Sequence, residues 1–321
     1  MVAPVLQSFG PGNVDETLTA TWYNMIPGIR DNVYKNNVFF NWLYKKNNMK
    51  MKLRGGAAVS HGIMYESNST AAAYQRYDIL DTTPQDGLTR DLWDWRQYDV
   101  SVSIDGYSER INAGGEKLED ILETKKMQAE EALHLLFEQH LFAASPGTKS
   151  LRSLPVIVLA SGTEGGINGT TQTWWESQVT ASGSFAARGR SDLTNLWNTI
   201  SIQNPVGGPE LILSDQNSFE YYEASLVAQK RFQNETKADA AFTTLTFKGT
   251  PWAWSPQATS GVIYMLHSKG LDYIVHSGTD FLVKPFVQPS NQDARVGHIL
   301  HMHSLTTGNR RKLGKLTGVT A

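Results

Sequence analysis

The chain of 321 residues contains no cysteine. This absence excludes disulfide bonds, catalytic thiolates and cysteine-based zinc sites. Charged residues are scarce as well, at 19% of the chain with a formal net charge of −2. A protein that binds nucleic acid through bulk electrostatics needs a basic excess on one face, which argues against that class. The basic residues that do cluster, at 45–54 and 310–315, fit local solvated or subunit-contact surfaces.

Long apolar runs are also missing from the sequence. No segment approaches the roughly 18 consecutive apolar residues that indicate a membrane-spanning helix. Residues 1–12 lack the charged segment, followed by an apolar one, that is typical of a secretory signal. We therefore expect a cytosolic product with no membrane partner.

Motifs with catalytic or metal-binding spacing are missing too. His298, His301 and His303 are the densest group of potential metal ligands, but a strand would place only His301 and His303 on one face. The glycine-rich residues 161–169 lack the Lys-Ser/Thr pair that a phosphate cradle requires. Carboxylates such as Glu130 fall on a predicted helix, where they usually form the solvated face. We expect no enzyme, no cofactor and no metal site.

Nine tryptophans stand out against this weakly charged background. At strand spacing Trp93 and Trp95 share one face, as do Trp252 and Trp254. Such pairs fit either a platform for sugars or bases, or a contact with another subunit. We favour the contact because aromatic side chains are enriched at protein interfaces. A Trp-rich carbohydrate-binding or hydrolytic protein is the alternative, and it would need a cleft with paired carboxylates.

A long polar excursion separates two strand-like runs. Val59, Ile63 and Tyr65 alternate in the first run, and the second run keeps a period of two as far as Ile104. The residues between them are turn-formers and charges, which bury too little surface to form a core. We interpret the runs as two arms of one hairpin. Because an isolated two-stranded ribbon is marginal in water, this hairpin should need a neighbouring molecule.

The longest predicted helix covers residues 116–143. Its apolar residues, among them Leu133 and Phe137, recur at three- and four-residue spacing, and carboxylates occupy its first turns. At about 1.5 Å per residue, a helix of roughly 28 residues would be about 42 Å long. That length is typical of a structural spine. We expect Leu133 to face a sheet and Glu130 to face solvent.

The rest of the chain mixes strands and helices. A helical stripe at 29–44 has no covering element close in sequence, so it packs either on the chain's own body or on another subunit. Residues 154–160 are predicted to form a strand. From about 190 to 265 helices and strands alternate, with a helix expected to be capped at 191–192 and a buried strand at 209–215. Strands return after that block, including 281–289 and 295–305, and no internal repeat is visible.

The order of these parts resembles that of the major capsid proteins of tailed bacteriophages, which have the Hong Kong 97-type fold. Residues 291–298 followed by 309–311 look like the C-terminal signature of a phage major-head subfamily. Residues 249–252, before the strand that contains Tyr264, look similar as well. The resemblance covers essentially the full chain and involves no catalytic motif. It implies an α+β fold.

The resemblance also implies a division into an arm, an extended hairpin called the E-loop, a peripheral domain and an axial domain. These regions would be the N-terminal arm at 1–53, the E-loop at 54–105, the peripheral domain at 106–190 and 243–321 with its spine helix at 116–143, and the axial domain at 191–242. Some relatives crosslink an E-loop lysine to an asparagine of a neighbour. Residues 55–105 contain no lysine, so we do not expect that bond here.

Self-assembly is the function that the resemblance implies. Subunits would form hexamers and pentamers that close an icosahedral capsid, the shell of a virion assembled in the cytoplasm of a host bacterium. The shell would enclose double-stranded DNA without sequence specificity, and scaffolding, portal and decoration proteins would be further partners. Another phage structural protein, such as a tail protein, is a second alternative, but it would lack so long a helix. Candidate subunit-contact residues on the E-loop and arm are Trp93, Trp95, Arg54, Asp78, Asp81, Arg96, Trp42 and Arg30.

Overall fold

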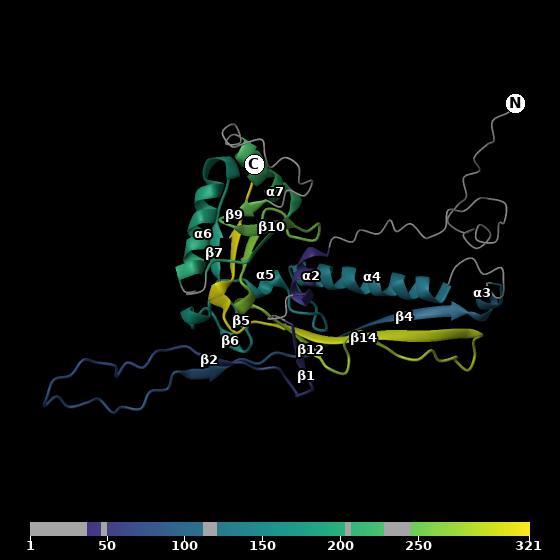
Figure 1. Cartoon of the computed structure of the whole chain (residues 1–321), viewed down its shortest axis with the longest axis horizontal. Coiled ribbons are helices and arrows are strands. Elements are labelled where there is room, and N and C mark those ends of the chain that lie inside the picture. Colours follow the sequence, from purple (N-terminus) through teal and green to yellow (C-terminus); the bar gives the residue numbers. More distant parts are fainter. Residues whose placement is uncertain (1–36, 46–49, 112–120, 203–206, 228–244) are drawn as a thin grey trace. The chain divides into compact units, whose positions relative to one another are not determined.

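The computed structural model describes residues 37–45, 50–111, 121–202, 207–227 and 245–321 (Figure 1). Most of the expected arm lies outside these residues, and so does Arg30. Parts of the expected spine helix and axial domain, at 116–120 and 228–242, also lie outside them. Within the described residues, two β-sheets of five and six strands carry most of the structure.

The first sheet is built around one long antiparallel pair. Strand β4 (Arg96–Asp105) pairs with β14 (Ala294–Thr306) along its whole length. Strand β14 also pairs with β12 (Asp272–His276) and β13 (Leu282–Val283), and β1 (Lys50–Leu53) lies parallel to β12. The alternating burial along β4 matches the predicted period of two, because one face of the strand is covered and the other is solvated.

The covered face of this sheet packs against helix α4 (Ile121–Phe142), which lies along β4 and β14 in Figure 1. Ala129, Leu133 and Phe137 recur at four-residue spacing and are buried in the clusters that join the helix to the sheet. The side chain of Leu133 is only 1% exposed, which confirms the predicted phase of the helix.

The second sheet draws its strands from distant parts of the chain. Helices α6 (Arg190–Ile202) and α7 (Gln216–Val227) pack against it, and α6 shares a core with Ile212 and Leu316. Strands from both sides of the expected axial boundary contribute, so this sheet is not confined to residues 191–242. In spatial order, the strands are β7 (Gln178–Ala181), β15 (Gly314–Thr317), β11 (Ile263–Leu266), β8 (Leu211–Ser214), β10 (Thr250–Trp254) and β9 (Thr246–Phe247).

Three local predictions were wrong. The run at 154–160 begins as helix α5 (Leu154–Ile157) and not as a strand, because Pro155 suits a first helical turn and the N–H of Val158 donates to the carbonyl of Leu154. Helix α6 starts one residue before the expected cap, since the π-turn η2 (Phe185–Gly189) leads into it. The predicted strand at 281–289 is reduced to the two residues of β13 and one further bridge between Val287 and Val296.

The predicted hairpin is also shorter than expected. Its paired stem consists of β2 (Gly62–Met64) and β3 (Leu88–Arg90), with one further bridge between Val59 and Trp93. The second predicted arm, β4, pairs with β14 instead, in the sheet whose apolar face α4 covers. The remaining short elements are α2 (Val38–Lys45), α3 (Gly106–Ile111), β5 (Thr163–Glu164), β6 (Ile167–Asn168), η1 (Thr173–Trp175), η5 (Ser268–Gly270) and η6 (Arg310–Lys312).

Candidate functional site

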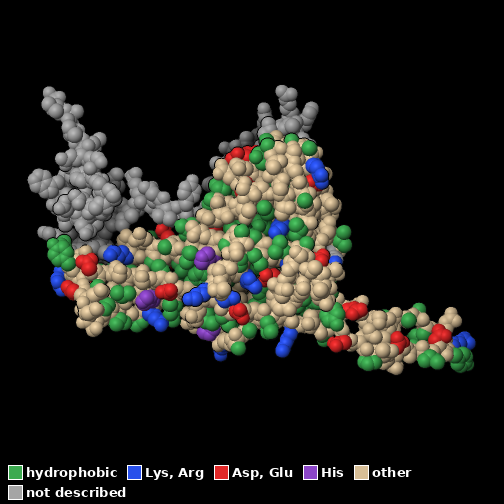
Figure 2. All heavy atoms as spheres, turned by 180° about the vertical axis from the view of Figure 1, so that it is seen from behind, with side chains coloured by type: hydrophobic (Ala, Val, Ile, Leu, Met, Phe, Trp, Pro, Cys, Tyr) green, Lys and Arg blue, Asp and Glu red, His purple; other side chains and the backbone are tan. Residues whose placement is uncertain are grey.

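Residues 65–87, here called the long loop, connect β2 to β3 and present apolar side chains to solvent. Every residue from 71 to 86 is exposed. Tyr77 and Ile79 are 96% and 98% exposed, and Tyr74 and Leu80 beside them are also largely exposed. Figure 2 shows hydrophobic side chains mixed with acidic ones along this extended segment. Such a surface gains nothing from the chain's own core and suits contact with another molecule.

The long loop is shaped by local turns. The carboxylate of Asp81 accepts hydrogen bonds from the hydroxyl and the backbone N–H of Thr83, and these bonds lower the pKa of Asp81. Asp78 accepts the backbone N–H of Gln75. These are the short-range bonds by which Asp stabilises turns without tertiary contacts. Both predicted contact residues therefore already have a local structural role.

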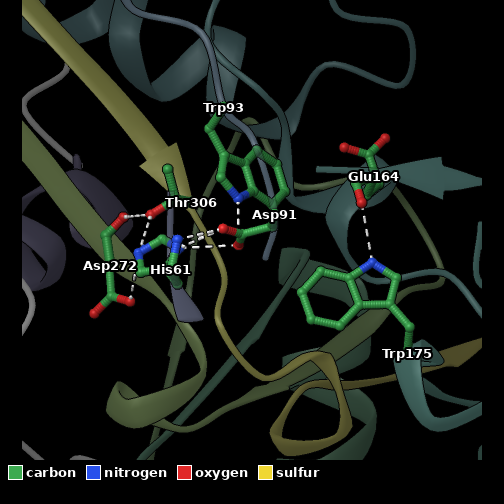
Figure 3. A network of polar contacts seen from close by, with 7 residues as sticks. All are labelled: His61, Asp91, Trp93, Glu164, Trp175, Asp272 and Thr306. Carbon is green, nitrogen blue, oxygen red and sulfur yellow. Dashed lines mark hydrogen bonds and ion pairs between the residues drawn. The ribbon is translucent and has the colours of Figure 1, made fainter. Parts of the chain in front are cut away.

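A buried polar network fixes the base of the long loop (Figure 3). Asp91, which follows β3, is 0% exposed. Its carboxylate accepts the indole N–H of Trp93 at 2.6 Å and lies 2.9 Å from Nδ1 of His61, and it also accepts the backbone N–H of His61. His61 precedes β2, so one carboxylate joins the two ends of the loop. A buried carboxylate requires such charged or polar partners.

The same histidine reaches the first sheet. Its Nε2 atom lies 3.5 Å from Oδ2 of Asp272 on β12 and 3.4 Å from the hydroxyl of Thr306 on β14. The hydrogen bond to Asp91 raises the pKa of His61, burial opposes this rise, and the negative charge of Asp272 adds to it. Burial raises the pKa of Asp272. The loop is thus attached to the sheet through a histidine held between two carboxylates.

Trp93 is not the surface anchor that the sequence predicted. Its side chain is 4% exposed and packs with Val59, Ile63, Trp175 and Ile274 in a core cluster of its own. The bridge to Val59 turns the indole inward, where Asp91 accepts its N–H. The chain itself covers this side chain, which contradicts a placement on the solvated face.

Trp95 and Arg96 lie nearer the surface than Trp93 but are also tied to their own chain. The indole N–H of Trp95 donates to the carbonyl of Gly56. Arg96 donates to the carbonyl of Thr148 at 2.6 Å and forms an ion pair with Asp94. Their role as subunit contacts stays a prediction.

The described part of the arm packs on the chain's own body. Phe39, Phe40 and Leu43 of α2 are buried in the main core, and Trp42 is half-buried beside them. Arg54 follows β1 and is exposed, so it is free to serve as a predicted contact residue.

The glycine-rich segment at 161–169 and Arg310 of the C-terminal basic cluster also make buried contacts close to this network. Arg310 is 0% exposed and donates to the carbonyls of Ile157 and Leu159, which contradicts a solvated role for this residue. Trp175 donates to the carbonyl of Glu164 at 3.0 Å (Figure 3). Sequence reasoning missed Arg310 because charge alone gives no signal of burial.

Gly165 packs directly against this network. Its φ angle is +61°, and an added Cβ would lie 3.0 Å from Cβ of Asp91 and from the ring of Trp93. The N–H of Leu92 donates to its carbonyl. The glycine-rich turn is therefore a packing surface for the base of the loop.

The three histidines of β14 lie on the faces of the strand that the sequence predicted. His301 and His303 are fully buried on one side of the strand, and both lie within hydrogen-bond distance of the hydroxyl of Tyr273. His298 is on the other side, next to Asp99. No cluster of three potential metal ligands occurs in the part of the chain that the structure describes. None of the described helices has an apolar stretch long enough to cross a bilayer.

The solvated face of the β4–β14 pair carries an open groove of about 510 Å³. Trp95, Leu300 and Met302 supply apolar side chains to its lining, Arg96 and Lys149 supply positive charge, and Asp99 supplies one negative charge. Sequence reasoning missed Leu300 and Met302, since a strand pattern alone does not tell which face of β14 is left open. The groove is thus bounded by Trp95 and residues of β4 and β14 together with Lys149.

Sequence comparisons gave no relative: no protein-family model matches the chain and no curated protein matches it. Solved structures do match over nearly the full length. The capsid asymmetric unit of cyanophage A-1(L) has a TM-score of 0.71 at 13% identity, with 96% of this chain and 99% of that chain covered. The capsid of a native GTA particle has a TM-score of 0.63 at 8% identity, covering 94% and 98% of the two chains.

An encapsulin is similar as well. The SrpI encapsulin complex from Synechococcus elongatus has a TM-score of 0.57 at 12% identity, with 97% of this chain and 96% of that chain covered. Identities this low show the fold alone, and the matches cover 94–97% of this chain. The chain therefore has the α+β, Hong Kong 97-type fold that tailed-phage capsid proteins adopt, as the sequence resemblance predicted.

Proposed function

We propose that this protein is the major capsid protein of a tailed double-stranded DNA phage or prophage. The observation that supports this most is the likeness to phage capsids over nearly the full length of both chains. Its copies would assemble as hexamers and pentamers into an icosahedral shell. Assembly would take place in the host cytoplasm and the product would be the virion capsid.

The long loop is the element that we assign to contact between copies. Tyr74, Tyr77, Ile79 and Leu80 expose apolar surface that their own chain does not cover. Burying that surface against a second copy would contribute roughly 25 cal/mol per Å². Many such modest contacts add up across a closed shell, while each one stays weak enough to reverse.

The groove on the first sheet is a suitable receiving surface for a loop from another copy. Its apolar lining matches the loop's aromatic and aliphatic residues, and Arg96 and Lys149 match the acidic residues Asp78 and Asp81. Trp95 would then act as a contact residue at the groove, whereas Trp93 would support it from within. This arrangement uses four of the predicted contact residues, which are Trp95, Arg96, Asp78 and Asp81, and leaves Arg54 as an exposed candidate outside it.

We also infer that the chain is divided into the regions that the capsid resemblance implies. A peripheral region would contain α4 and the first sheet, and an axial region would contain α6, α7 and the centre of the second sheet. A scaffolding protein, a portal and a decoration protein would be further partners, and packaged DNA would be enclosed without sequence specificity. The role is structural and not enzymatic. An encapsulin-type shell is the second candidate, because the SrpI complex covers the chain equally well.

Electron microscopy of the purified full-length protein, with light scattering, tests the proposal. We expect closed shells or capsomers, and nuclease-protected DNA in particles from the native source would separate a phage capsid from an encapsulin-type shell. A monodisperse monomer that binds glycans would overturn the proposal. The contact role of the loop is tested by replacing Tyr77 and Ile79 together with serine, which should reduce shell yield. The control is Ile202→Ser, at an apolar residue of α6 that is 80% exposed.

A further inference from the structure

At the base of the long loop, the imidazole of His61 lies between the carboxylates of Asp91 and Asp272. His61 stands before β2 and Asp91 after β3, so their contact closes the loop across 30 residues of sequence. Asp91 is fully buried and also receives the indole N–H of Trp93. This side of the imidazole is therefore fixed by the loop's own ends.

The other side of the imidazole faces the sheet. Nε2 lies near Oδ2 of Asp272, which comes from β12, and near the hydroxyl of Thr306, which comes from β14 (Figure 3). Gly308, just after β14, packs against the same ring and carries no charge. Among the described residues, the charged groups that face His61 from these elements are Asp91 and Asp272.

The protonation state decides how many of these contacts the ring can make. An imidazolium donates from both nitrogens, whereas a neutral imidazole donates from only one. If the neutral ring keeps its N–H toward Asp91, the lone pair of Nε2 faces the carboxylate of Asp272. The loop would then remain joined to itself but lose its charged link to the sheet.

We propose that His61 is a proton-controlled latch that ties the base of the long loop to the first sheet. The imidazolium bridges Asp91 and Asp272 and holds the loop at a fixed position, and loss of the proton loosens that attachment. The latch acts within one subunit, so it goes beyond the proposed assembly and does not depend on it. Its consequence for a shell would be a loop presented rigidly in mild acid and more freely above neutral pH.

The direction of the effect follows from the pKa of His61, which is raised above its usual value of 6.5 mainly by the bond to Asp91. The added stability is fully present below that usual value and is lost as the pH rises through the raised pKa. The pKa of Asp272 is also raised, by burial, and an acid of that kind likewise contributes less as the pH rises. That second effect concerns the folding free energy of the subunit; the latch itself weakens because His61 loses its charge, while the ionised carboxylate of Asp272 is the partner that the imidazolium needs.

Hydrogen exchange of the full chain tests the latch. Protection of the amides at 61–64 and 88–93, corrected for intrinsic exchange, is measured at about pH 6 and about pH 8, on either side of the usual range for histidine. Light scattering must give the same oligomeric state at both values. Amides of the buried strand β8 serve as the internal reference.

We expect protection at the loop base to be severalfold lower at about pH 8 than at about pH 6. Each unit by which the fold raises the pKa of His61 corresponds to a roughly tenfold change in the opening equilibrium. His61→Asn keeps a neutral donor toward Asp91 and should remove the pH dependence. His298→Asn, at an exposed histidine beside Asp99, should leave it intact. Equal protection at both pH values in the wild type, or a pH dependence that survives His61→Asn, overturns the proposal.

A second variant covers the case in which His61→Asn does not fold. Asp272→Asn leaves the bond between His61 and Asp91 in place and should reduce the pH dependence without abolishing it. An unchanged pH dependence in Asp272→Asn overturns the latch. A protein that shows the latch but forms no shells would overturn the proposed function alone.

Discussion

Single buried carboxylates join segments that are distant in the sequence. Glu138 on α4 is fully buried, and its carboxylate accepts the backbone N–H groups of Phe39 and Phe40 and the hydroxyl of Ser255. The first N–H groups of a helix have no partner inside the helix, so Glu138 caps α2 from another helix. Burial raises the pKa of Glu138, and these bonds oppose that rise.

Glu138→Ala should therefore destabilise the subunit strongly. It leaves two helix N–H groups and one hydroxyl without their acceptor, and each unsatisfied buried group costs about 1–3 kcal/mol. Urea unfolding followed by circular dichroism would measure the loss. Gln139→Ala changes the exposed residue next to it and is the matched control. Equal stability of the two variants would mean that α2 does not depend on this carboxylate.

Leu133 tests the packing of α4 on the sheet. Leu133→Ala should lower the free energy of unfolding by about 2–5 kcal/mol, because it removes a fully buried side chain from a close-packed core. Glu130→Ala should change it by less than about 0.5 kcal/mol, since its ion pair with Lys126 is exposed. Comparable losses in chemical denaturation would show that the helix packs in another phase.

Trp93 tests the corrected position of that side chain. Trp93→Ala should lower the stability of the isolated subunit by about 3–5 kcal/mol, since a large buried ring is removed and Asp91 loses a donor. Leu92→Ala, at the exposed neighbouring residue, should change it little. The measurement is a thermal melt of unassembled subunits. A melt unchanged by Trp93→Ala would return this residue to the surface role that the sequence predicted.

At the scale of elements, the contacts that join the long loop to other described residues lie at its base. Glu66 and Gly87 lie side by side where the loop leaves the stem, with the hydroxyl of Tyr65 donating to the carbonyl of Asp86. The ring of Tyr65 also stacks on Trp174 at 5.3 Å between ring centroids. Beyond this point every residue except the half-buried Thr70 is exposed, so we expect that the fold of the subunit does not require them.

Deletion of residues 67–86, with an Asn-Gly turn between Glu66 and Gly87, should leave a folded subunit. Its free energy of unfolding should change by less than about 1 kcal/mol, because a shorter loop alters only the closure entropy. The same variant should form no shells under conditions in which the full chain does. Calorimetry and electron microscopy on one preparation check both expectations. A subunit that fails to fold would place the loop in the core.

At the scale of the whole molecule, the buried histidines couple stability to pH. His303 is fully buried, and its pKa lies well below 6.5 because burial disfavours the charged form and His301 and His140 repel it. The stability that neutral His303 contributes is present above the usual histidine pKa and is lost as the pH falls below it. This sign is opposite to that of His61, so acid should weaken the core while it tightens the loop base.

His303→Gln should reduce the acid sensitivity of the subunit. Between about pH 7.5 and about pH 5.5, the wild type should lose more stability than the variant, by up to about 1.4 kcal/mol per pH unit below the usual pKa. Comparing variants separates the histidine from Glu138 and Asp272, whose raised pKa values act in the other direction. His298→Gln is the control at an exposed position. Identical urea midpoints at both pH values for wild type and His303→Gln would contradict the expectation.

Local periodicity determined much of this fold directly from the sequence. The alternation in β4, the phase of Leu133 on α4 and the shared face of His301 and His303 all follow from residue spacing, because a regular backbone places side chains at fixed intervals. The order of the elements was enough to indicate the capsid fold, and the exposure of the loop followed from a composition that cannot form a core.

Pairing between distant segments was decided only by the tertiary structure. Strand β4 pairs with β14 and not with the first hairpin arm, and the buried indole of Trp93 donates to Asp91. A period of two fixes which residues share a face of a strand, but not which face is covered. The latch around His61 likewise combines residues that are far apart in sequence, such as Asp272. Burial, and with it the direction of each pKa shift, depends on what packs from elsewhere in the chain, which no local pattern contains.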